Sequence, residues 1–135
     1  MHVSIVTAME ISTEINKKNN IRRHIVRGVI DISELTESLK EIYNSPDFDP
    51  ELNVFWDLQQ ADFSSISSED VRSFMEYVVK LWGTGGKSRA ALVVSDNLGY
   101  GMSRMYQMMM EGATSSEVAV FKDINKAKEW IEAET

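Results

Sequence analysis

Residues 89 to 110 read Arg-Ala-Ala-Leu-Val-Val-Ser-Asp-Asn-Leu-Gly-Tyr-Gly-Met-Ser-Arg-Met-Tyr-Gln-Met-Met-Met. The apolar start of this stretch is typical of a strand buried on both faces, as in parallel sheets. The polar residues 95 to 97 then end the strand, and Gly99 and Gly101 favour a tight turn before a methionine-rich helix. Such a strand, loop and helix form half of a βαβ unit, and α/β proteins bind ligands at these strand ends. We therefore expect the functional surface at the loop 95 to 101.

Periodicity along the rest of the chain predicts an α/β fold with the order β-β-α-β-α-β-α-β-α. The length of 135 residues suits a single domain, residues 1 to 135. An asparagine-rich link predicts that the first two strands are antiparallel. The expected strands are 3 to 11, 21 to 30, 52 to 58 (ending at Asp57), 90 to 94 and 118 to 121, with helix N-caps at Ser33, Ser67 and Asp123 and a glycine stop at 83 to 86.

Composition narrows the functional classes. The chain has a formal net charge of -7, which is atypical of a general nucleic-acid binder. It contains no cysteine, so it has no disulfide, thiolate nucleophile or cysteine-based metal site. No apolar stretch is long enough to span a bilayer, and the N-terminus lacks a signal-peptide pattern. We expect a cytoplasmic protein.

A local basic cluster stands out against this acidic background. The favoured interpretation is a solvated hairpin tip, because turn-forming asparagines accompany it. The alternative is a docking patch for an acidic partner. The cluster consists of Lys17, Lys18, Arg22, Arg23, His24 and Arg27.

Phosphate-binding and hydrolase motifs are absent. Residues 83 to 88 (Gly-Thr-Gly-Gly-Lys-Ser) lack the first glycine of a P-loop, since that position holds Leu81, and they follow a helix instead of preceding one. The chain has two histidines, His2 and His24, both in the expected first strands, and no Gly-x-Ser-x-Gly elbow.

Asp57 and Asp96 are the remaining candidates for chemistry. A receiver-type phosphoacceptor at Asp57 would need further carboxylates at the end of the first strand, where only Glu10 is available. The two aspartates could also form an acid/base pair at adjacent strand ends. We favour the simpler role of binding loop and helix N–H groups. The sequence therefore predicts no enzyme, no cofactor and no metal site.

Three stretches together resemble the SpoIIAA-like family of small bacterial proteins, which have the STAS-like fold. The resemblance covers nearly the whole chain, and Tyr-Gly-Met-x-Arg-Met is its most specific part. It implies a mixed sheet with helices packed against it, and a regulatory role like that of anti-sigma factor antagonists. The stretches are Trp56-Asp57-Leu58, Tyr100-Gly101-Met102-Ser103-Arg104-Met105-Tyr106, and Val120-Phe121-Lys122-Asp123 with Ala127 and Trp130-Ile131.

The antagonists switch through phosphorylation of a serine after the central strand, within an Asp-Ser-x-Gly signature. Residues 63 to 70 here read Phe-Ser-Ser-Ile-Ser-Ser-Glu-Asp and lack that signature. Ser64, Ser65 and Ser67 are the candidate phosphoacceptors. Glu69 and Asp70 would repel a phosphate there, and Ser67 is better explained as an N-cap.

The methionine-rich helix has two interpretations. One helical stripe predicts core packing for Leu98, Met102, Met105 and Met109. The consecutive methionines 108 to 110 point about 100° apart, so at least one lies outside that stripe. Exposed methionine is common at adaptable binding surfaces, which favours a protein partner or a homodimer. Alternatively the helix lines a pocket for a small apolar ligand, since the wider STAS-like fold resembles lipid-binding CRAL-TRIO domains.

Arg104 lies one turn inside this helix. It can hold a carboxylate or phosphate beside the helix N–H groups, but we favour a salt bridge to Asp57 or Asp96. The sequence thus predicts a non-enzymatic regulatory binding module, with a carrier or sensor of an apolar or anionic ligand as the alternative. The candidate binding residues are Asp57, Ser95, Asp96, Tyr100, Gly101, Arg104 and Met108.

Overall fold

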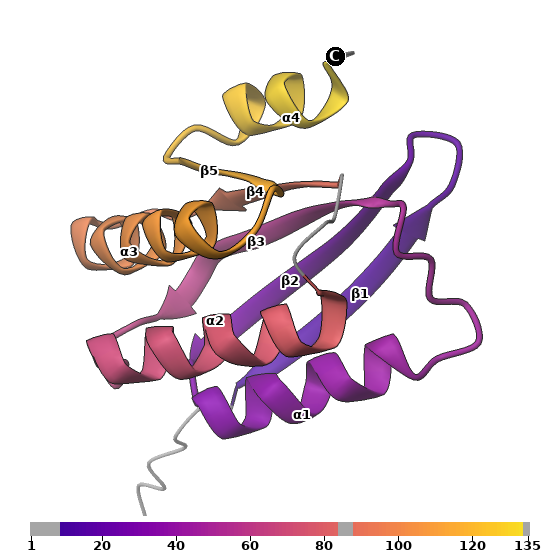
Figure 1. Ribbon diagram of the computed structural model, residues 1–135. Helices are drawn as coiled ribbons and strands as arrows, with labels where there is room; N and C mark the ends of the chain where they lie inside the picture. The colour runs from indigo at the N-terminus through magenta and orange to yellow at the C-terminus, as the bar shows by residue number, and fades with distance from the viewer. Residues whose placement is uncertain (1–8, 84–87, 134–135) are drawn as a thin grey trace, which may run out of the picture.

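The computed structural model describes residues 9–83 and 88–133, which form one five-stranded sheet and four helices (Figure 1). The element order β-β-α-β-α-β-α-β-α and the single mixed sheet confirm the predicted fold class. The strands are β1 (Glu10–Asn16), β2 (Ile21–Val29), β3 (Asn53–Asp62), β4 (Arg89–Val93) and β5 (Glu117–Phe121), and the helices are α1 (Ile32–Tyr43), α2 (Ser68–Trp82), α3 (Asn97–Ala113) and α4 (Ile124–Glu132).

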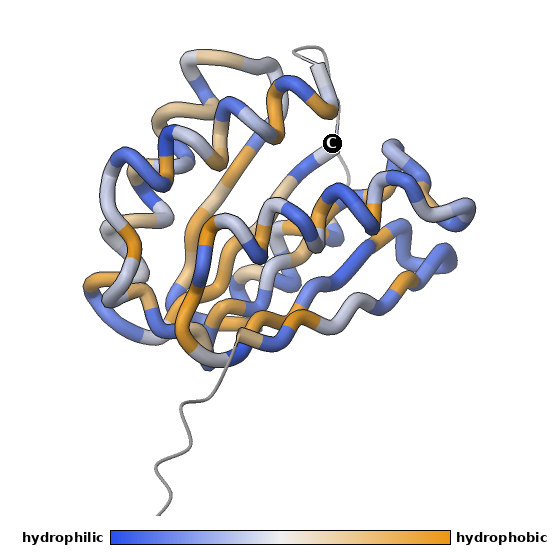
Figure 2. The backbone as a smooth tube through the Cα atoms, turned by 90° about the horizontal axis from the view of Figure 1, so that it is seen from below, coloured by the Kyte–Doolittle hydropathy of each residue, from blue (hydrophilic) through white to orange (hydrophobic). Residues whose placement is uncertain are grey.

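The strands lie in the sheet in their sequence order, from β1 to β5. β1 and β2 are antiparallel, as predicted, and the other neighbours are parallel. Helices α1, α2 and α3 pack on one face and α4 packs on the other, as Figure 1 shows for α4 against α1 and α2. Hydrophobic positions recur along each helix instead of filling it (Figure 2), so each helix buries one side and exposes the other.

Alternation along β3 distributes its side chains between the two faces. Trp56 and Leu58 pack with the larger core beneath α1, α2 and α3. Phe55 packs with Ile131 of α4 in the smaller core on the opposite face. Asp57, the next residue of this second set, therefore lies on the α4 side of the sheet.

Two of the three predicted helix caps are confirmed. Ser67 caps α2 in a capping box with Asp70, and Asp123 caps α4, both as predicted. The prediction of Ser33 for α1 was wrong. Asp31 is the N-cap, since its side chain accepts from the Glu34 backbone N–H and the helix already begins at residue 32.

Two strand boundaries were also wrong. The first strand was predicted to end at residue 11, but β1 continues to Asn16; residues 3 to 8 of the prediction lie outside the described part of the chain. The central strand does not end at Asp57 but continues to Asp62, because β3 keeps pairing with β2 as far as Val29. Of the predicted glycine stop after α2, Gly83 is the C-cap, and residues 84 to 86 lie outside the described chain.

The predicted tight turn at Gly99 and Gly101 was wrong as well. Asp96 caps α3 directly after β4, so both glycines lie in the helix. A Cβ on Gly99 would lie 3.0 Å from ring atoms of Phe63, whereas a Cβ on Gly101 would meet nothing within 4 Å. Gly99 therefore serves close packing and not a turn.

The basic cluster is only partly solvated. Lys17 and Lys18 are exposed in the hairpin turn, as expected for a solvated tip. Arg22 and His24 contradict that interpretation, because both side chains are fully buried beneath α1 and α2. They share one face of β2 with Val26, and that face points into the core.

Candidate functional site

Most of the predicted binding residues lie on the exposed side of α3 or directly before that helix. We call Leu98, Tyr100, Gly101, Arg104 and Met108 the α3 surface; all five are exposed. Leu98 is 47%, Tyr100 37% and Met108 56% exposed, and these are three of the five large hydrophobic side chains exposed among the described residues. The exposure of Met108 agrees with the prediction that one methionine leaves the core stripe. The core position predicted for Leu98 was wrong.

The core side of α3 agrees with the predicted stripe except at Leu98. Met102, Met105 and Met109 pack against the larger core, as predicted, and Tyr106 does so too. The buried residues of the helix are Gly99, Ser103 and Met110. Gly99 lies close to Phe63, which brings the start of the helix near the chain after β3. Leu98 precedes Gly99 by about 100° around the helix axis and faces solvent.

Polar contacts frame the α3 surface. Arg104 Nη1 donates to Gln107 Oε1 at 2.6 Å, and Gln107 Nε2 donates to Glu111 Oε1 at 3.2 Å. Lys122 Nζ donates to the Asn97 side chain at 2.5 Å and lies 5.4 Å from the centre of the Tyr100 ring. The salt bridge predicted from Arg104 to Asp57 or Asp96 was therefore wrong, because Arg104 is satisfied within its own helix.

Ser95 and Asp96 position the start of α3. Ser95 Oγ donates to the Gln59 carbonyl at 2.9 Å, which ties the end of β4 to β3. Asp96 Oδ1 accepts from the Gly99 N–H at 2.7 Å and caps the helix. Both side chains thereby bind backbone groups. For Asp96 this is the simpler of the two roles considered.

Asp57 is separated from the α3 surface by the sheet. Its carboxylate pairs with Arg23 at 3.2 Å and accepts from the Gln59 N–H at 3.2 Å. The Arg23 guanidinium also lies 5.5 Å from the centre of the Phe55 ring, on the α4 side. The structure thus brings Ser95, Asp96 and the α3 surface together and leaves Asp57 elsewhere.

The serine segment between β3 and α2 lies on the surface. Ser64 and Ser65 are exposed, and the Ser64 N–H donates to Asp62 Oδ1 at 2.8 Å. The hydrogen bonds from Ser64 lower the pKa of Asp62. Ser67 Oγ accepts from the Asp70 N–H at 3.1 Å, so its hydroxyl already serves the helix cap.

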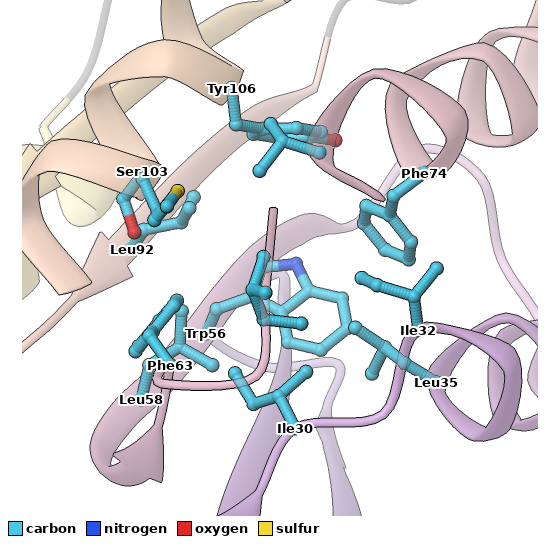
Figure 3. A pocket seen from close by; sticks show the side chains of 13 residues that line it. Ile30, Ile32, Leu35, Trp56, Leu58, Phe63, Phe74, Leu92, Ser103 and Tyr106 are labelled. Carbon is cyan, nitrogen blue, oxygen red and sulfur yellow. The ribbon is translucent and has the colours of Figure 1, made fainter. Parts of the chain in front are cut away.

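An apolar cavity lies between the sheet and helices α1, α2 and α3 (Figure 3). Its volume is about 80 Å³, and its one small polar lining residue is Ser103, which is 3% exposed. The Ser103 hydroxyl has no hydrogen-bond partner among the described residues. The cavity is lined by Ile30, Ile32, Leu35, Trp56, Leu58, Phe63, Ile66, Val71, Phe74, Leu92, Met102, Ser103 and Tyr106.

Sequence reasoning predicted a pocket wall on the methionine helix but missed the residues that form it. Tyr106 and Ser103 line the cavity, whereas Met108 points away from it. Burial raises the pKa of Tyr106 well above its ordinary value. The available signal was a serine on the apolar side of the helix, one turn before a tyrosine.

Neither a metal site nor a membrane-spanning helix is present in the described residues. Within residues 9–83 and 88–133, no three His, Asp or Glu side chains gather closely enough to hold a metal ion. In the same part of the chain, no helix combines the length and apolar character needed to cross a membrane.

Comparisons with known proteins identify the fold. No family model and no curated protein matches the chain. A solved protein of the DUF3478 family with a SpoIIAA-like fold, from Shewanella loihica PV-4, matches with a TM-score of 0.59 and 18% identity, over 97% of this chain and 99% of that one. An anti-sigma factor antagonist from Mycobacterium paratuberculosis matches with a TM-score of 0.56 and 13% identity, over 97% and 100% of the two chains. The chain therefore has a SpoIIAA-like fold, as the sequence resemblance implied.

Proposed function

We propose that this chain is a non-enzymatic regulatory module of the cytoplasm that binds a protein partner through the α3 surface. The observation that carries the proposal is the exposure of Leu98, Tyr100 and Met108 on one short stretch of structure. The likeness to an anti-sigma factor antagonist supports a protein-binding role.

The composition of the α3 surface suits a protein interface. Aromatic residues, methionine and arginine are enriched at the centres of interfaces, and the surface presents one of each. Around the helix axis Met108 lies between Leu98 and Arg104, and along the axis it lies about 15 Å from Leu98, so the apolar side chains extend along the exposed side of α3. Its flexible thioether suits an adaptable contact. Polar groups accompany them, with Lys122 near Tyr100 and Gln107 and Glu111 toward the C-terminal end of the helix.

The α3 surface is held on a rigid base. Asp96 caps the helix, Ser95 ties its start to β3, and Gly99 allows close packing on Phe63. A surface that is ordered before binding loses little conformational entropy when a partner docks. The partner is either a different protein or a second copy of this chain.

Affinity capture from the native cells tests the proposal. Tagged wild type is compared with Met108→Lys and with the matched control Leu81→Lys, which changes a 39% exposed residue on α2. We expect the wild type and the control to capture the same partner protein. The captured amount of that partner is expected to decrease about 30-fold with Met108→Lys, as for loss of a binding hot spot. Light scattering on each variant then distinguishes a homodimer. Equal capture by all three proteins would refute the role of the α3 surface.

Phosphorylation of Ser64 or Ser65 is the regulatory device that we propose for this module, by analogy with the antagonists. Both side chains are exposed and reachable by a kinase, whereas the Ser67 hydroxyl is engaged in the α2 cap. An intact mass spectrum of protein from its native cells tests it. Absence of phosphate on all three serines under every growth condition sampled would remove the switch and leave the binding proposal standing.

The apolar cavity supports a second candidate function, a carrier or sensor of a small apolar ligand. Its buried Ser103 hydroxyl is free to bind a polar atom of a guest. Native mass spectra of gently purified protein would show a retained ligand. A retained mass that Ser103→Leu eliminates would support this function, and a bare chain for the wild type would count against it.

A further inference from the structure

The buried guanidinium of Arg22 carries an inference beyond the binding roles above. Arg22 lies on β2 beneath the ends of α1 and α2, and it is 1% exposed. Its Cζ atom lies 5.6, 4.7 and 5.8 Å from the ring centres of Tyr43, Phe48 and Trp82. Aromatic rings therefore surround the cation and offset part of the cost of burying it.

One edge of the guanidinium is satisfied through a short relay. Arg22 Nε donates to His24 Nε2 at 3.2 Å, and His24 Nδ1 lies 2.9 Å from Thr13 Oγ1. Burial, and then the neighbouring Arg22, lower the pKa of His24 to about 3. His24 is therefore neutral, so its Nε2 accepts from Arg22 and its Nδ1–H donates to Thr13.

The other edge of the guanidinium has no partner. Neither Nη1 nor Nη2 of Arg22 has a hydrogen-bond partner among the described residues. Burial lowers the pKa of Arg22, and the nearby Tyr43 and Asp49 oppose this only in part. No described carboxylate forms an ion pair with Arg22. An unpaired buried charge is costly, and native proteins rarely contain one without a counter-charge.

A cavity of about 20 Å³ adjoins this group. It exceeds the roughly 10–15 Å³ that one water molecule needs. Trp82, whose indole Nε1–H also lacks a partner, lines the same cavity. Trp56, Phe74 and Tyr106 line both this cavity and the larger apolar one. Unpartnered donors of Arg22 and Trp82 thus border a cavity that shares three lining residues with the larger apolar one.

We propose that this cavity is an anion site in which Arg22 Nη1 and Nη2, with Trp82 Nε1, bind a compact monovalent anion. The anion is either a free ion or the carboxylate of a short apolar acid whose tail enters the adjoining cavity. Bidentate binding of an anion is what a guanidinium edge favours, and it supplies the missing counter-charge. The free-ion form is independent of the proposed function, and the acid form rests on the ligand-carrier alternative.

Thermal unfolding at constant ionic strength tests the site. Sodium gluconate, which is too large for the cavity, is replaced stepwise by chloride, formate or hexanoate, with hexanol as the uncharged comparison. We expect a saturable rise in Tm of about 4 °C or more with a binding anion. A response to chloride and formate but not to hexanoate identifies a free ion, and a much larger response to hexanoate identifies the apolar acid.

Variants then locate the response. Arg22→Met is expected to abolish the anion-dependent rise, and Trp82→Phe to weaken it while keeping the ring. Arg23→Met, on the same strand but paired with Asp57 on the other face, is expected to keep the full rise. If Arg22→Met does not fold, Trp82→Phe and an anomalous bromide peak beside the Arg22 Nη atoms in crystals provide the test.

Two results would overturn the proposal. The first is a Tm that is indifferent to all three anions together with no bromide peak, which would mean that water alone fills the cavity. The second is an equal rise with hexanol and hexanoate that persists in Arg22→Met. That result would leave only the apolar cavity as a ligand site.

Discussion

Lowering the pH from 7.5 to 5 is expected to destabilise this protein through a single buried histidine. His24 is fully buried, donates to Thr13, accepts from Arg22 and lies 4.4 Å from the Trp56 ring, measured between centroids. Burial and Arg22 lower its pKa from 6.5 to about 3. Between these values the unfolded chain binds a proton that the folded protein does not bind, so the free energy of unfolding falls as the pH decreases below 6.5.

The two pKa values set the size of the effect. At pH 5 the unfolded histidine is almost fully protonated and the folded one is neutral, which corresponds to a loss of about 2 kcal/mol relative to pH 7.5. Urea unfolding followed by tryptophan fluorescence at several pH values measures it. His24→Gln, which keeps a donor and an acceptor but does not titrate, controls for every other group.

The change in unfolding free energy with pH is compared between the two proteins, because the variant has a lower absolute stability at every pH. We expect the wild type to lose about 2 kcal/mol more than His24→Gln between pH 7.5 and 5. The other histidine, His2, is present in both proteins and cancels in the difference. Equal losses in the two proteins would show that His24 titrates normally, and the buried relay with Arg22 would then be wrong.

Four further substitutions test the packing around α3 and α2 by urea unfolding. Gly99→Ala is expected to destabilise the protein by about 1–3 kcal/mol, because the added methyl group contacts Phe63. Gly101→Ala is expected to stabilise it by up to about 1 kcal/mol through helix propensity. A change in unfolding free energy of the same sign for both variants would contradict the observed start of α3. Ser67→Ala is expected to cost about 1 kcal/mol by removing the α2 cap, and no loss would mean that another group caps the helix. Ser103→Ala is expected to raise the unfolding free energy by about 1 kcal/mol, because a buried hydroxyl without a partner is removed; a loss would reveal a hidden hydrogen bond.

Local sequence patterns predicted several elements closely. The apolar run of β4 predicted that strand within one residue at each end, and Ser67 and Gly83 predicted the two ends of α2. The N-caps Ser67 and Asp123 were predicted because each is a strong capping residue directly before its helix. The antiparallel start followed from the asparagine-rich link, and the mixed sheet was implied by the family resemblance.

Most of the features that failed depend on distant partners. Arg22 lies on the buried face of β2 by alternation, yet its charge predicted exposure. The rings of Tyr43, Phe48 and Trp82, which are distant from it in sequence, surround it in the fold. The turn at Gly99 failed because Asp96 caps the helix immediately and Phe63 packs on the glycine. The cap is a local contact that the prediction missed, whereas the contact with Phe63 does not follow from local sequence.

The candidate site was predicted in part for the same reason. The exposed positions of Tyr100, Arg104 and Met108 follow from helical spacing once the start of α3 is known. Asp57 was grouped with them because it was placed at a strand end. Since β3 continues to Asp62, strand alternation places Asp57 on the opposite face, where it pairs with Arg23.

Site-specific photo-crosslinking in the native cells tests the central claim most directly. A photoreactive phenylalanine analogue replaces Met108 on the α3 surface or, as the control, Leu81 on α2; both side chains are exposed. Our account predicts a crosslinked product of one defined mass from position 108, either a partner protein or a second copy of this chain, and no such product from position 81. The same products from both positions, or none from position 108, would contradict it.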